Sequence, residues 1–473
     1  MVTTSAVAQR KVSEAINDAA VQQLKASMRG VIIQPGDASY DSARALYNAM
    51  IDKRPALIAQ CRDVADVISA VNFGRENKLD IAIRSGGHHG AGLSSVDGGL
   101  VIDLSLMKGI RVDPQARTVR AQAGCTQGEV DHATHIFGLA TPTGIVSTTG
   151  IGGLTLGGGT GNLTRSYGLA IDNLLEADVV LADGSFVIAN EKMNSDLFWA
   201  LRGGGGNFGV VTSFMYKLYP VSTVYGGPIW WDLKDAGKIW SAWCDFIVDA
   251  PEYVNGYFGL HTVPPSPPFP EEHWNKKMGI IMWCFPGDQK QAEAIIKPFR
   301  DMIPPAIDMA GPLPFTALQS IFDPLMPAGM QWYWNHDFFV EMTDEAIDTA
   351  LKHFAQVPNW QCAMHFYSVN GAVHRVGKKD TAWNYREANF SQVIVGVDFD
   401  RANKEKIMKW SKAYWQAMHP YSAGGAYINM MMDEGQERVQ AAYRENYPRL
   451  AQIKKKYDPT NLFHMNQNIK PAS

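Results

Sequence analysis

The chain has 473 residues, of which 46% are apolar and 19% are charged, and its net charge is −4. This composition argues against disorder, and at roughly 150 residues per domain the length indicates two or three structural units. Because the charge is slightly negative and no run of five like charges occurs, the sequence gives no electrostatic footprint for nucleic acid or for an anionic membrane.

The first thirty residues contain no apolar stretch as long as a signal peptide, and no run of about eighteen apolar residues follows anywhere. We therefore expect a soluble, cytoplasmic protein. The five cysteines are odd in number, widely spaced and never arranged as a CxxC pair. This favours isolated buried thiols over a disulfide framework or a zinc site.

In chain order, the first predicted element is a helix, because Val64, Val67, Ile68 and Val71 recur at helical spacing after Asp63, a candidate N-cap. Short apolar runs then predict strands over residues 80–84, 100–104, 119–123 and 177–182. The dipeptide Asp183-Gly184 after the last of these predicts a hairpin turn.

In the second half, alternation predicts strands over residues 367–375 and 391–398, followed by a helix over residues 402–418. A further helical stretch is predicted from Gln436 to Lys456 and ends before Pro459. In the aromatic run Gln331 to His336, strand alternation would direct Trp332 and Trp334 to one face and Tyr333 to the other.

Glycine and tryptophan divide the chain. Residues 1–217 hold 28 of the 43 glycines and one tryptophan, Trp199, whereas residues 218–425 hold the other 12 of 13 tryptophans. Glycine allows the backbone to approach a ligand closely, and large rings build apolar pockets with a few polar tips. We interpret the first half as a cofactor cradle and the second as a substrate wall.

Nine of the 25 residues from Gly144 to Gly168 are glycine, and a second loop, Arg84-Ser85-Gly86-Gly87, follows a predicted strand. Successive backbone N–H groups in such loops can bind phosphate, with hydroxyl groups of Ser147, Thr148 and Thr149 as added donors. The dinucleotide fingerprint is not met, and no glycine-lysine-serine or glycine-lysine-threonine tripeptide indicates a P-loop. Glycine-rich turns in a packed sheet remain the alternative.

Four segments resemble FAD-linked oxidases of the vanillyl-alcohol oxidase superfamily with a PCMH-type FAD-binding domain, in the berberine-bridge-enzyme-like branch. They are RSGGHHGAG at 84–92, TPTGIVSTTGIGGLTLGGGTGNLTRSYGLAIDN at 141–173, RGGGGNFGVVTSF at 202–214 and YDPTNLFHMNQNI at 457–469. The resemblance implies an α+β fold with a two-part FAD-binding domain, formed by residues 1–217 and completed by residues 426–473. Residues 218–425 would be an inserted substrate domain built on an antiparallel sheet flanked by helices.

In that family the histidine after Arg-Ser-Gly-Gly is bonded to the flavin 8α-methyl carbon, which implies a covalent link to FAD at His88. A neutral imidazole nitrogen is a suitable nucleophile for this bond. A hydrogen-bonding role is the alternative for His88 and the favoured one for His89. Many members add a second bond from a cysteine, but the resemblance places Val146 at that position. We therefore predict a single covalent attachment.

The resemblance also implies the remaining contacts of the cofactor. The glycine loops, a strand near the adenine and the C-terminal segment would supply Arg84, Ser85, Gly86, Gly87, His89, Ser147, Thr148, Gly152, Gly153, Gly158, Gly161, Val210, Val211, Asn466 and Asn468. Asn466 and Asn468 could instead cap a buried turn, because asparagine bonds readily to nearby backbone.

A flavin oxidase needs a base that removes a proton from the substrate as hydride leaves. The Tyr-x-Asn motif of the family is here Tyr427-Ile428-Asn429, and Tyr427 is the favoured catalytic base. Arg375 takes the position of the glutamate base of berberine-forming enzymes, but a guanidinium cannot accept a proton. Arg375 could instead lower the pKa of a tyrosine or hold the substrate, or lie at the surface.

The sequence thus predicts an FAD-dependent oxidase that removes hydride from an alcohol, an amine or a sugar hemiacetal and returns the electrons to O₂ as hydrogen peroxide. The alternatives are a dehydrogenase with another electron acceptor and a non-catalytic flavin-binding protein. The expected partners are a small-molecule substrate and O₂, without nucleic acid or membrane, and the oligomeric state is open. His132 and His135 are spaced as metal ligands can be, but no third ligand lies nearby in the sequence.

Overall fold

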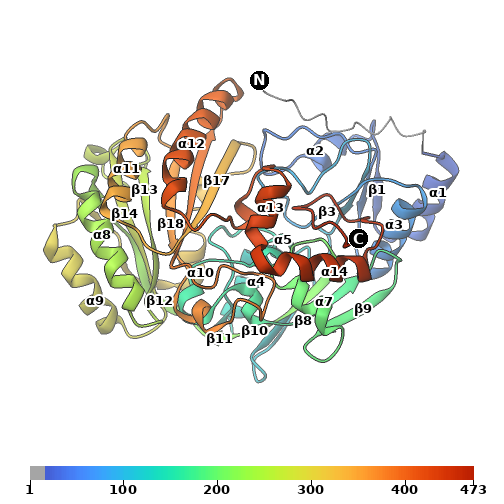
Figure 1. Cartoon of the computed structure of the whole chain (residues 1–473), viewed down its shortest axis with the longest axis horizontal. Helices are drawn as coiled ribbons and strands as arrows, with labels where there is room; N and C mark the ends of the chain where they lie inside the picture. The colour runs from blue at the N-terminus through green and yellow to red at the C-terminus, as the bar shows by residue number, and fades with distance from the viewer. Residues whose placement is uncertain (1–15) are drawn as a thin grey trace.

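The N-terminal part of the chain forms a small mixed sheet (Figure 1). In the computed structural model, which describes residues 16–473, its strand order is β1-β2-β4-β3, with β2 and β3 parallel to β4. These strands are β1 (Val31–Ile33), β2 (Leu57–Gln60), β3 (Ile81–Arg84) and β4 (Leu100–Asp103). Helix α3 (Val64–Glu76) connects β2 to β3, and the Asp63 side chain caps it by accepting from the Asp66 N–H. The predicted helix after Asp63, its cap, and the strands predicted over residues 80–84 and 100–104 are confirmed.

A second, antiparallel sheet follows, with the order β5-β6-β10-β8-β9. Its strands are β5 (Ile110–Asp113), β6 (Thr118–Gln122), β8 (Leu174–Val180), β9 (Phe186–Asn190) and β10 (Val210–Lys217). The turn between β8 and β9 contains Gly184 at φ +86°, a conformation that favours glycine, which confirms the predicted hairpin. A two-stranded ribbon pairs β7 (Leu139–Ala140) with β11 (Tyr219–Pro220).

Short helices complete this lobe. The glycine-rich stretch from Gly144 to Gly168 forms two of them, α5 (Ile151–Gly157) and α6 (Thr164–Tyr167). The others in this half are α1 (Asp18–Ser27), α2 (Tyr40–Arg44), α4 (Gln127–His135) and α7 (Ser195–Leu201).

The second half forms one large antiparallel sheet in the order β15-β12-β14-β13-β18-β19-β17, with β16 also pairing β12. Its strands are β12 (Thr223–Asp232), β13 (Asn255–Thr262), β14 (Lys277–Phe285), β15 (Ile307–Asp308), β16 (Gly311–Pro314), β17 (Gln331–Phe339), β18 (Ala363–Ser368) and β19 (Phe390–Asp398). One face is covered by α8 (Leu233–Asp249), α9 (Gln289–Met302), α11 (Asp344–Phe354) and α12 (Lys404–Met418). Figure 1 shows α8, α9 and α11 on the outer side of the sheet, and α12 contributes to the same core, so the expected antiparallel sheet flanked by helices is present.

Strand alternation divides the aromatic side chains between the two faces of this sheet. Trp231 belongs to the outer core under the helices, whereas Trp230 and Trp332 face the first lobe. In β19, Ile394 likewise points outward, and Val393 and Val395 point inward. The inner face thus presents an aromatic and aliphatic surface to the lobe that carries the glycine loops.

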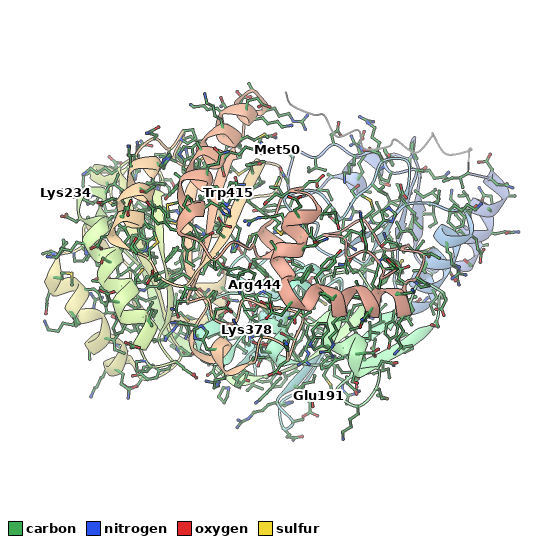
Figure 2. The ribbon with its side chains drawn as sticks, viewed as in Figure 1. Met50, Glu191, Lys234, Lys378, Trp415 and Arg444 are labelled. Carbon is green, nitrogen blue, oxygen red and sulfur yellow. The ribbon has the colours of Figure 1, made fainter. Side chains whose placement is uncertain are left out.

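The C-terminal segment packs against the first lobe and shares its core, which gathers residues between Val21 and Leu218 with residues between Ala426 and Ile469. The helical stretch predicted from Gln436 to Lys456 is confirmed, but it is interrupted. The stretch is divided into α13 (Gln436–Tyr443), a 3₁₀ turn and α14 (Tyr447–Tyr457). Arg444, labelled in Figure 2, ends α13 at φ +47°.

The strand predicted over residues 367–375 is wrong beyond Ser368, where β18 ends. The chain turns there at Gly371, with φ +65°, into a 3₁₀ turn, Gly371–Arg375. A β-carbon at Gly371 would lie 2.8 Å from the carbonyl oxygen of Arg165, so the turn is held tightly against α6. Among residues 16–473, no helix is both long and apolar enough to cross a membrane.

Candidate active site

A cavity of about 280 Å³ lies where the glycine loops of the first lobe face the inner side of the large sheet. Residues 85–89 and most of residues 144–154 and 205–211 form one wall, and β17, β18 and β19 form the opposite wall. Residues 463–467 of the C-terminal segment close one end. Within the described part of the chain, no lysine, arginine, aspartate or glutamate lines this cavity, so backbone groups and neutral side chains supply its polarity.

Two glycine loops meet backbone to backbone at the cavity. A β-carbon at Gly86 would lie 2.4 Å from the amide nitrogen of Gly150, and one at Gly150 would lie 2.2 Å from that of Gly86. Only glycine allows such an approach. Gly153 and Gly206 meet nothing within 4 Å on their side-chain side, so their backbone remains accessible from the cavity.

Several of the predicted cofactor contacts lie together on this wall. Those that line the cavity are Ser85, Gly86, Gly87, His88, His89, Gly152, Gly153, Val211 and Asn466. The four glycines among them leave room for a ligand to contact the main chain.

His88 lines the cavity as a neutral imidazole, because burial lowers its pKa to about 4. Its Nε2 atom lies 3.1 Å from Oγ1 of Thr148. Tyr47 stacks on the imidazole, with the ring centres 4.0 Å apart and the planes 19° from parallel. A neutral imidazole has one nitrogen with a lone pair, which is what a bond to carbon requires, and the stacked Tyr47 holds the ring in place.

Tyr47 is a site residue that sequence reasoning missed. Its hydroxyl donates to the carbonyl oxygen of Met326 at 2.8 Å, which fixes the ring that covers His88. Tyr47 stands alone in the segment ALYNAM, without glycine, repeat or motif around it, so no signal in a single sequence marks it.

His89 has both ring nitrogens occupied by backbone groups. Its Nδ1 accepts from the Ala91 N–H at 3.2 Å, and its Nε2 lies 3.3 Å from the carbonyl oxygen of Ile428. Burial lowers its pKa to about 4, so the ring is neutral and the second contact is a donation. This arrangement supports the structural role favoured for His89, in which it ties the loop to the C-terminal segment.

Tyr427 also lines the cavity, and its hydroxyl oxygen accepts two hydrogen bonds. The donors are the backbone N–H of Gly159 at 2.7 Å and Nδ2 of Asn429 at 2.8 Å. Burial raises the pKa of Tyr427 to about 12, although these two donors oppose the shift. With both donors on the oxygen, the phenolic hydrogen is left for an acceptor in the cavity.

Arg84 and Ser147 do not line the cavity. The Arg84 guanidinium is buried behind the loop and pairs with Asp103, with Nη2 2.8 Å from Oδ2. Ser147 is turned toward the other lobe, where its N–H donates to Oδ1 of Asp323 at 2.9 Å and its hydroxyl bonds to the same carboxylate. Ser147 therefore holds the two lobes together, and its hydroxyl is not free for a phosphate.

Gly158, Gly161 and Val210 do not line the cavity either. Gly158, at φ +140°, lies under the ring of Tyr427, and a β-carbon at Gly161 would lie 2.4 Å from the carbonyl oxygen of Thr143. Gly158 and Gly161 are therefore needed because other segments of the same chain pack closely against them. Val210 is fully buried in β10, and its neighbour Val211 points to the cavity instead.

At the C-terminus, Asn466 lines the cavity and Asn468 does not. Asn466 donates from Nδ2 to the carbonyl oxygens of Gly206 and Phe463, and its Oδ1 is buried without a protein partner. Gln467, which sequence reasoning did not select, lines the cavity beside Asn466. The resemblance identified this C-terminal segment as part of the site, but the fold of the turn determines which of its side chains face the cavity.

Arg375 lies outside the cavity, which corrects its selection as a catalytic residue. Its side chain is largely exposed in the 3₁₀ turn after β18 and pairs with Glu252. The predicted strand would have carried Arg375 along the sheet, but the turn at Gly371 directs it to solvent. His132 and His135 lie on α4, and residues 16–473 contain no group of three or more metal-ligating side chains.

The opposite wall of the cavity is mainly apolar. Trp332 and Trp334 come from β17, and Val393 and Val395 from β19. The two tryptophans lie on one face, with Tyr333 on the other side near Lys412, as alternation predicted. His365 and Tyr367 of β18 are the polar side chains of this wall, and the sequence analysis did not select them.

The residues present fit FAD. A cavity with accessible glycine backbone on one side suits a diphosphate, since amide N–H groups bind anions without a cationic side chain. The unpartnered Oδ1 of Asn466 and the unpartnered hydroxyl of Ser94 both line the cavity and are free for polar groups of a ligand. The aromatic and aliphatic wall suits the flat faces of a ring system and a substrate.

Comparison with known proteins extends over both lobes. Residues 55–190 match the family described as FAD binding domain, and residues 426–470 match the family described as berberine and berberine like. An FAD-linked oxidoreductase of Dictyostelium discoideum is 30% identical over 456 residues, which cover 95% of this chain and 97% of the relative.

Two further similarities concern oxidases. The (R)-6-hydroxynicotine oxidase of Paenarthrobacter nicotinovorans is 40% identical over 193 residues, which cover 41% of this chain and 42% of that enzyme. The crystal structure of 6-hydroxy-D-nicotine oxidase from Arthrobacter nicotinovorans matches with a TM-score of 0.85 and 26% identity, covering 94% of this chain and 99% of that one. The arrangement of both lobes is therefore shared with a solved structure.

Proposed function

This chain is an FAD-dependent oxidoreductase of the berberine-bridge-enzyme-like family, and we propose that it is an oxidase whose FAD is bound covalently through His88 alone. Its substrate would be a small alcohol, amine or sugar hemiacetal. The observation that carries the proposal is a neutral, stacked imidazole on the wall of a glycine-lined cavity.

The chain's residues divide the work of holding FAD. Gly86, Gly150, Gly153 and Gly206 would offer backbone to the diphosphate side, and Asn466 would bond to a polar edge. Bound FAD supplies the acceptor for hydride and, in an oxidase, passes the electrons to O₂ to give hydrogen peroxide.

A single tether is supported by the cavity wall itself. Val146 lines the cavity, whereas the five cysteines of the chain are free, buried and absent from its lining. A thioether to the cofactor needs a cysteine within bonding distance, and valine offers no such group. We propose the corresponding domain boundaries: residues 1–217 and 426–473 hold the cofactor, and residues 218–425 form the substrate wall.

Tyr427 is the proposed base. Its O–H has no acceptor among residues 16–473, while Gly159 and Asn429 donate to the oxygen and would stabilise a developing negative charge. Since the cavity lining holds no carboxylate among residues 16–473, an acidic side chain does not compete for this role there.

The mass of the denatured protein tests the tether. We expect the wild type to carry the added mass of FAD and His88→Ala to lose it, while His132→Ala, an exposed histidine outside the cavity, keeps it. FAD mass retained by His88→Ala would refute the assignment, and a protein that takes up no flavin at all would refute the proposed function.

Oxygen use separates the oxidase from its alternatives. With a substrate found by anaerobic bleaching of the flavin absorbance, an oxidase consumes O₂ and releases hydrogen peroxide in air. Turnover that depends on an added dye instead would identify a dehydrogenase. Flavin that no alcohol, amine or sugar bleaches would identify a non-catalytic flavin-binding protein.

A further inference from the structure

Residues 47–50, which we call the junction segment, connect the loop that carries His88 to the part of the chain that leads into β17. On the side of the loop, the Tyr47 N–H donates to the carbonyl oxygen of Gly87 at 3.3 Å. On the other side, the carbonyl oxygen of Tyr47 accepts from the Gly329 N–H at 3.0 Å. The junction segment is therefore hydrogen-bonded to both walls of the active site at their bases.

Asn48 is completely buried, and its side-chain amide makes four hydrogen bonds. Its Nδ2 donates to the carbonyl oxygens of Gly90 at 2.7 Å and of Trp332 at 2.9 Å. Its Oδ1 accepts from the N–H groups of Trp332 and of Met50, which is labelled in Figure 2, each at 3.0 Å. An amide has two N–H groups and two lone pairs, so its whole capacity is used. One side chain thus fixes the main chain of the loop, of β17 and of the junction segment relative to one another.

The main chain that is fixed in this way carries side chains of both cavity walls. Gly90 follows two residues after His88, and Trp332 lines the opposite wall. The Tyr47 ring stacks on His88, with ring centres 4.0 Å apart, and on Trp332, with ring centres 5.1 Å apart. A β-carbon at Gly90 would lie 2.9 Å from Cε3 of Trp334, so the loop packs directly on β17. The position of the His88 ring therefore depends on the junction segment.

We propose that Asn48 and Tyr47 are positioning residues for the covalent attachment of FAD, which hold the imidazole of His88 where it reaches the 8α carbon. This rests on the proposed function, which includes that bond. Asn48 does not line the cavity, so it acts through the loop, whereas Tyr47 acts through its stacked ring. Reacting atoms must approach to about 3–3.5 Å, and a displacement of about 1 Å can slow a reaction about hundredfold.

The attachment needs an oxidant, and O₂ of the proposed oxidase reaction is sufficient. A bond forms between an imidazole nitrogen and the 8α carbon. One proton leaves that carbon and one leaves the imidazole, and the two protons and two electrons pass to O₂, which becomes hydrogen peroxide. The residues of the junction segment take no part in this exchange and only set the distance across which the bond forms.

The rate of attachment tests the positioning role. The full-length chain, produced in flavin-starved cells, is mixed with FAD in air, and the flavin that stays with the protein after acid precipitation is followed over time. With FAD at a concentration that saturates binding, we expect Asn48→Ala to form the bond about tenfold more slowly than the wild type. The FAD concentration that gives half the maximal rate should change little, because the glycine-lined wall is unaltered.

Asn255→Ala is the matched control for Asn48→Ala. Asn255 is also buried, and it connects β13 to α6, with Nδ2 donating to Oγ of Ser166 at 2.6 Å and Oδ1 accepting from the Ser166 N–H at 3.0 Å. It has no contact with the loop of His88 and does not line the cavity. Urea unfolding should show a loss of stability in both variants, whereas only Asn48→Ala should attach FAD slowly.

Two variants of Tyr47 keep the test valid if Asn48→Ala does not fold. Tyr47→Phe retains the ring that stacks on His88 and loses only the hydroxyl bond to Met326. Tyr47→Leu loses the ring itself. We expect the rate of attachment to fall several-fold in Tyr47→Leu and to stay close to that of the wild type in Tyr47→Phe.

The outcomes separate this inference from the proposed function. A wild type whose flavin is always released by acid would refute the bond at His88, and the positioning role with it. A wild type that retains flavin, together with Asn48→Ala or Tyr47→Leu that retains it at the same rate, would overturn the positioning role alone. Equal slowing in Asn255→Ala would also overturn it, because the effect would then come from lost stability.

Discussion

Tyr427, the proposed base, holds a proton that it would have to lose before it could take one from a substrate. Its hydroxyl oxygen accepts from Gly159 and Asn429, and its pKa of about 12 keeps it protonated at neutral pH. Below that pKa, the fraction of phenolate therefore increases about tenfold with each unit by which the pH rises. A base of this kind makes the reaction faster as the solution becomes more alkaline.

We predict that the rate of anaerobic flavin reduction rises between pH 7 and pH 9 in the wild type and loses this rise in Tyr427→Phe. Stopped-flow absorbance with a saturating substrate measures it. Tyr443→Phe is the control, because Tyr443 is equally buried with an unpartnered hydroxyl but does not line the cavity. The same rise in Tyr427→Phe would remove Tyr427 as the base.

At the residue scale, motifs identified those side chains whose chemistry or backbone is unusual. The glycine loops and His88 stood out in the sequence, because close backbone approach demands glycine and a loop histidine in that context is distinctive. Tyr47 has no such mark, since its role comes from a stacking contact across the fold. Ser147 was placed in the right loop, but its hydroxyl turns to Asp323, a residue far away in the sequence.

Among the elements, α14 is fixed to the cofactor lobe by a buried ion pair. Nζ of Lys454 donates to Asp458 at 2.7 Å and to the carbonyl oxygens of Asn207 and Phe463. The Asp458 carboxylate in turn accepts from the N–H groups of Leu462 and Phe463. This pair shapes the turn that leads into the cavity end at residues 463–467.

We predict that Lys454→Met destabilises the protein by about 3–5 kcal/mol, because it leaves the Asp458 charge buried without its partner. Urea unfolding followed by tryptophan fluorescence measures it. Lys456→Met, which removes an exposed lysine paired with Asp196, should cost less than about 1 kcal/mol. Similar losses in the two variants would contradict the role given to the buried pair.

The elements themselves were largely predictable where the hydrophobic pattern is long. Helix α3 with its Asp63 cap and strand β19 follow from periodicity alone. The break between α13 and α14 was missed, because the apolar spacing continues across Arg444 and only tertiary contacts hold its positive φ. The end of β18 was missed for the same reason, since the turn at Gly371 is set by packing on α6.

At the scale of the whole molecule, the two halves meet through buried polar groups. Asp131 of α4 accepts from Nε2 of Gln319 at 3.2 Å, and Gln319 belongs to α10 (Phe315–Gln319) of the other half. Burial raises the pKa of Asp131 to about 7, and its second oxygen has no partner. In the folded protein, protonated Asp131 is thus the favoured form below about pH 7.

We predict that Asp131 makes the fold less stable as pH rises from about 4 to about 7, by about 1.4 kcal/mol per unit. The sign follows because the folded pKa exceeds the unfolded one, so the unfolded chain gives up the proton first. The stability of Asp131→Asn should not fall with pH in this way, so above pH 7 this variant should gain stability relative to the wild type. Urea unfolding midpoints measured at pH 5 and pH 8 test this. Glu437→Gln, at an exposed position, should follow the wild type, and parallel profiles for Asp131→Asn would contradict the prediction.

The closure of the cavity by residues 463–467 sets an order of events during synthesis. The loops around Gly86, Gly150 and Gly206 leave the ribosome well before Phe463 and Asn466 do. While residues 463–467 are still inside the ribosome exit tunnel, one end of the cavity is open. We therefore expect a chain truncated before Phe463 to bind flavin more weakly than the whole chain, which the flavin absorbance of the two purified proteins would show.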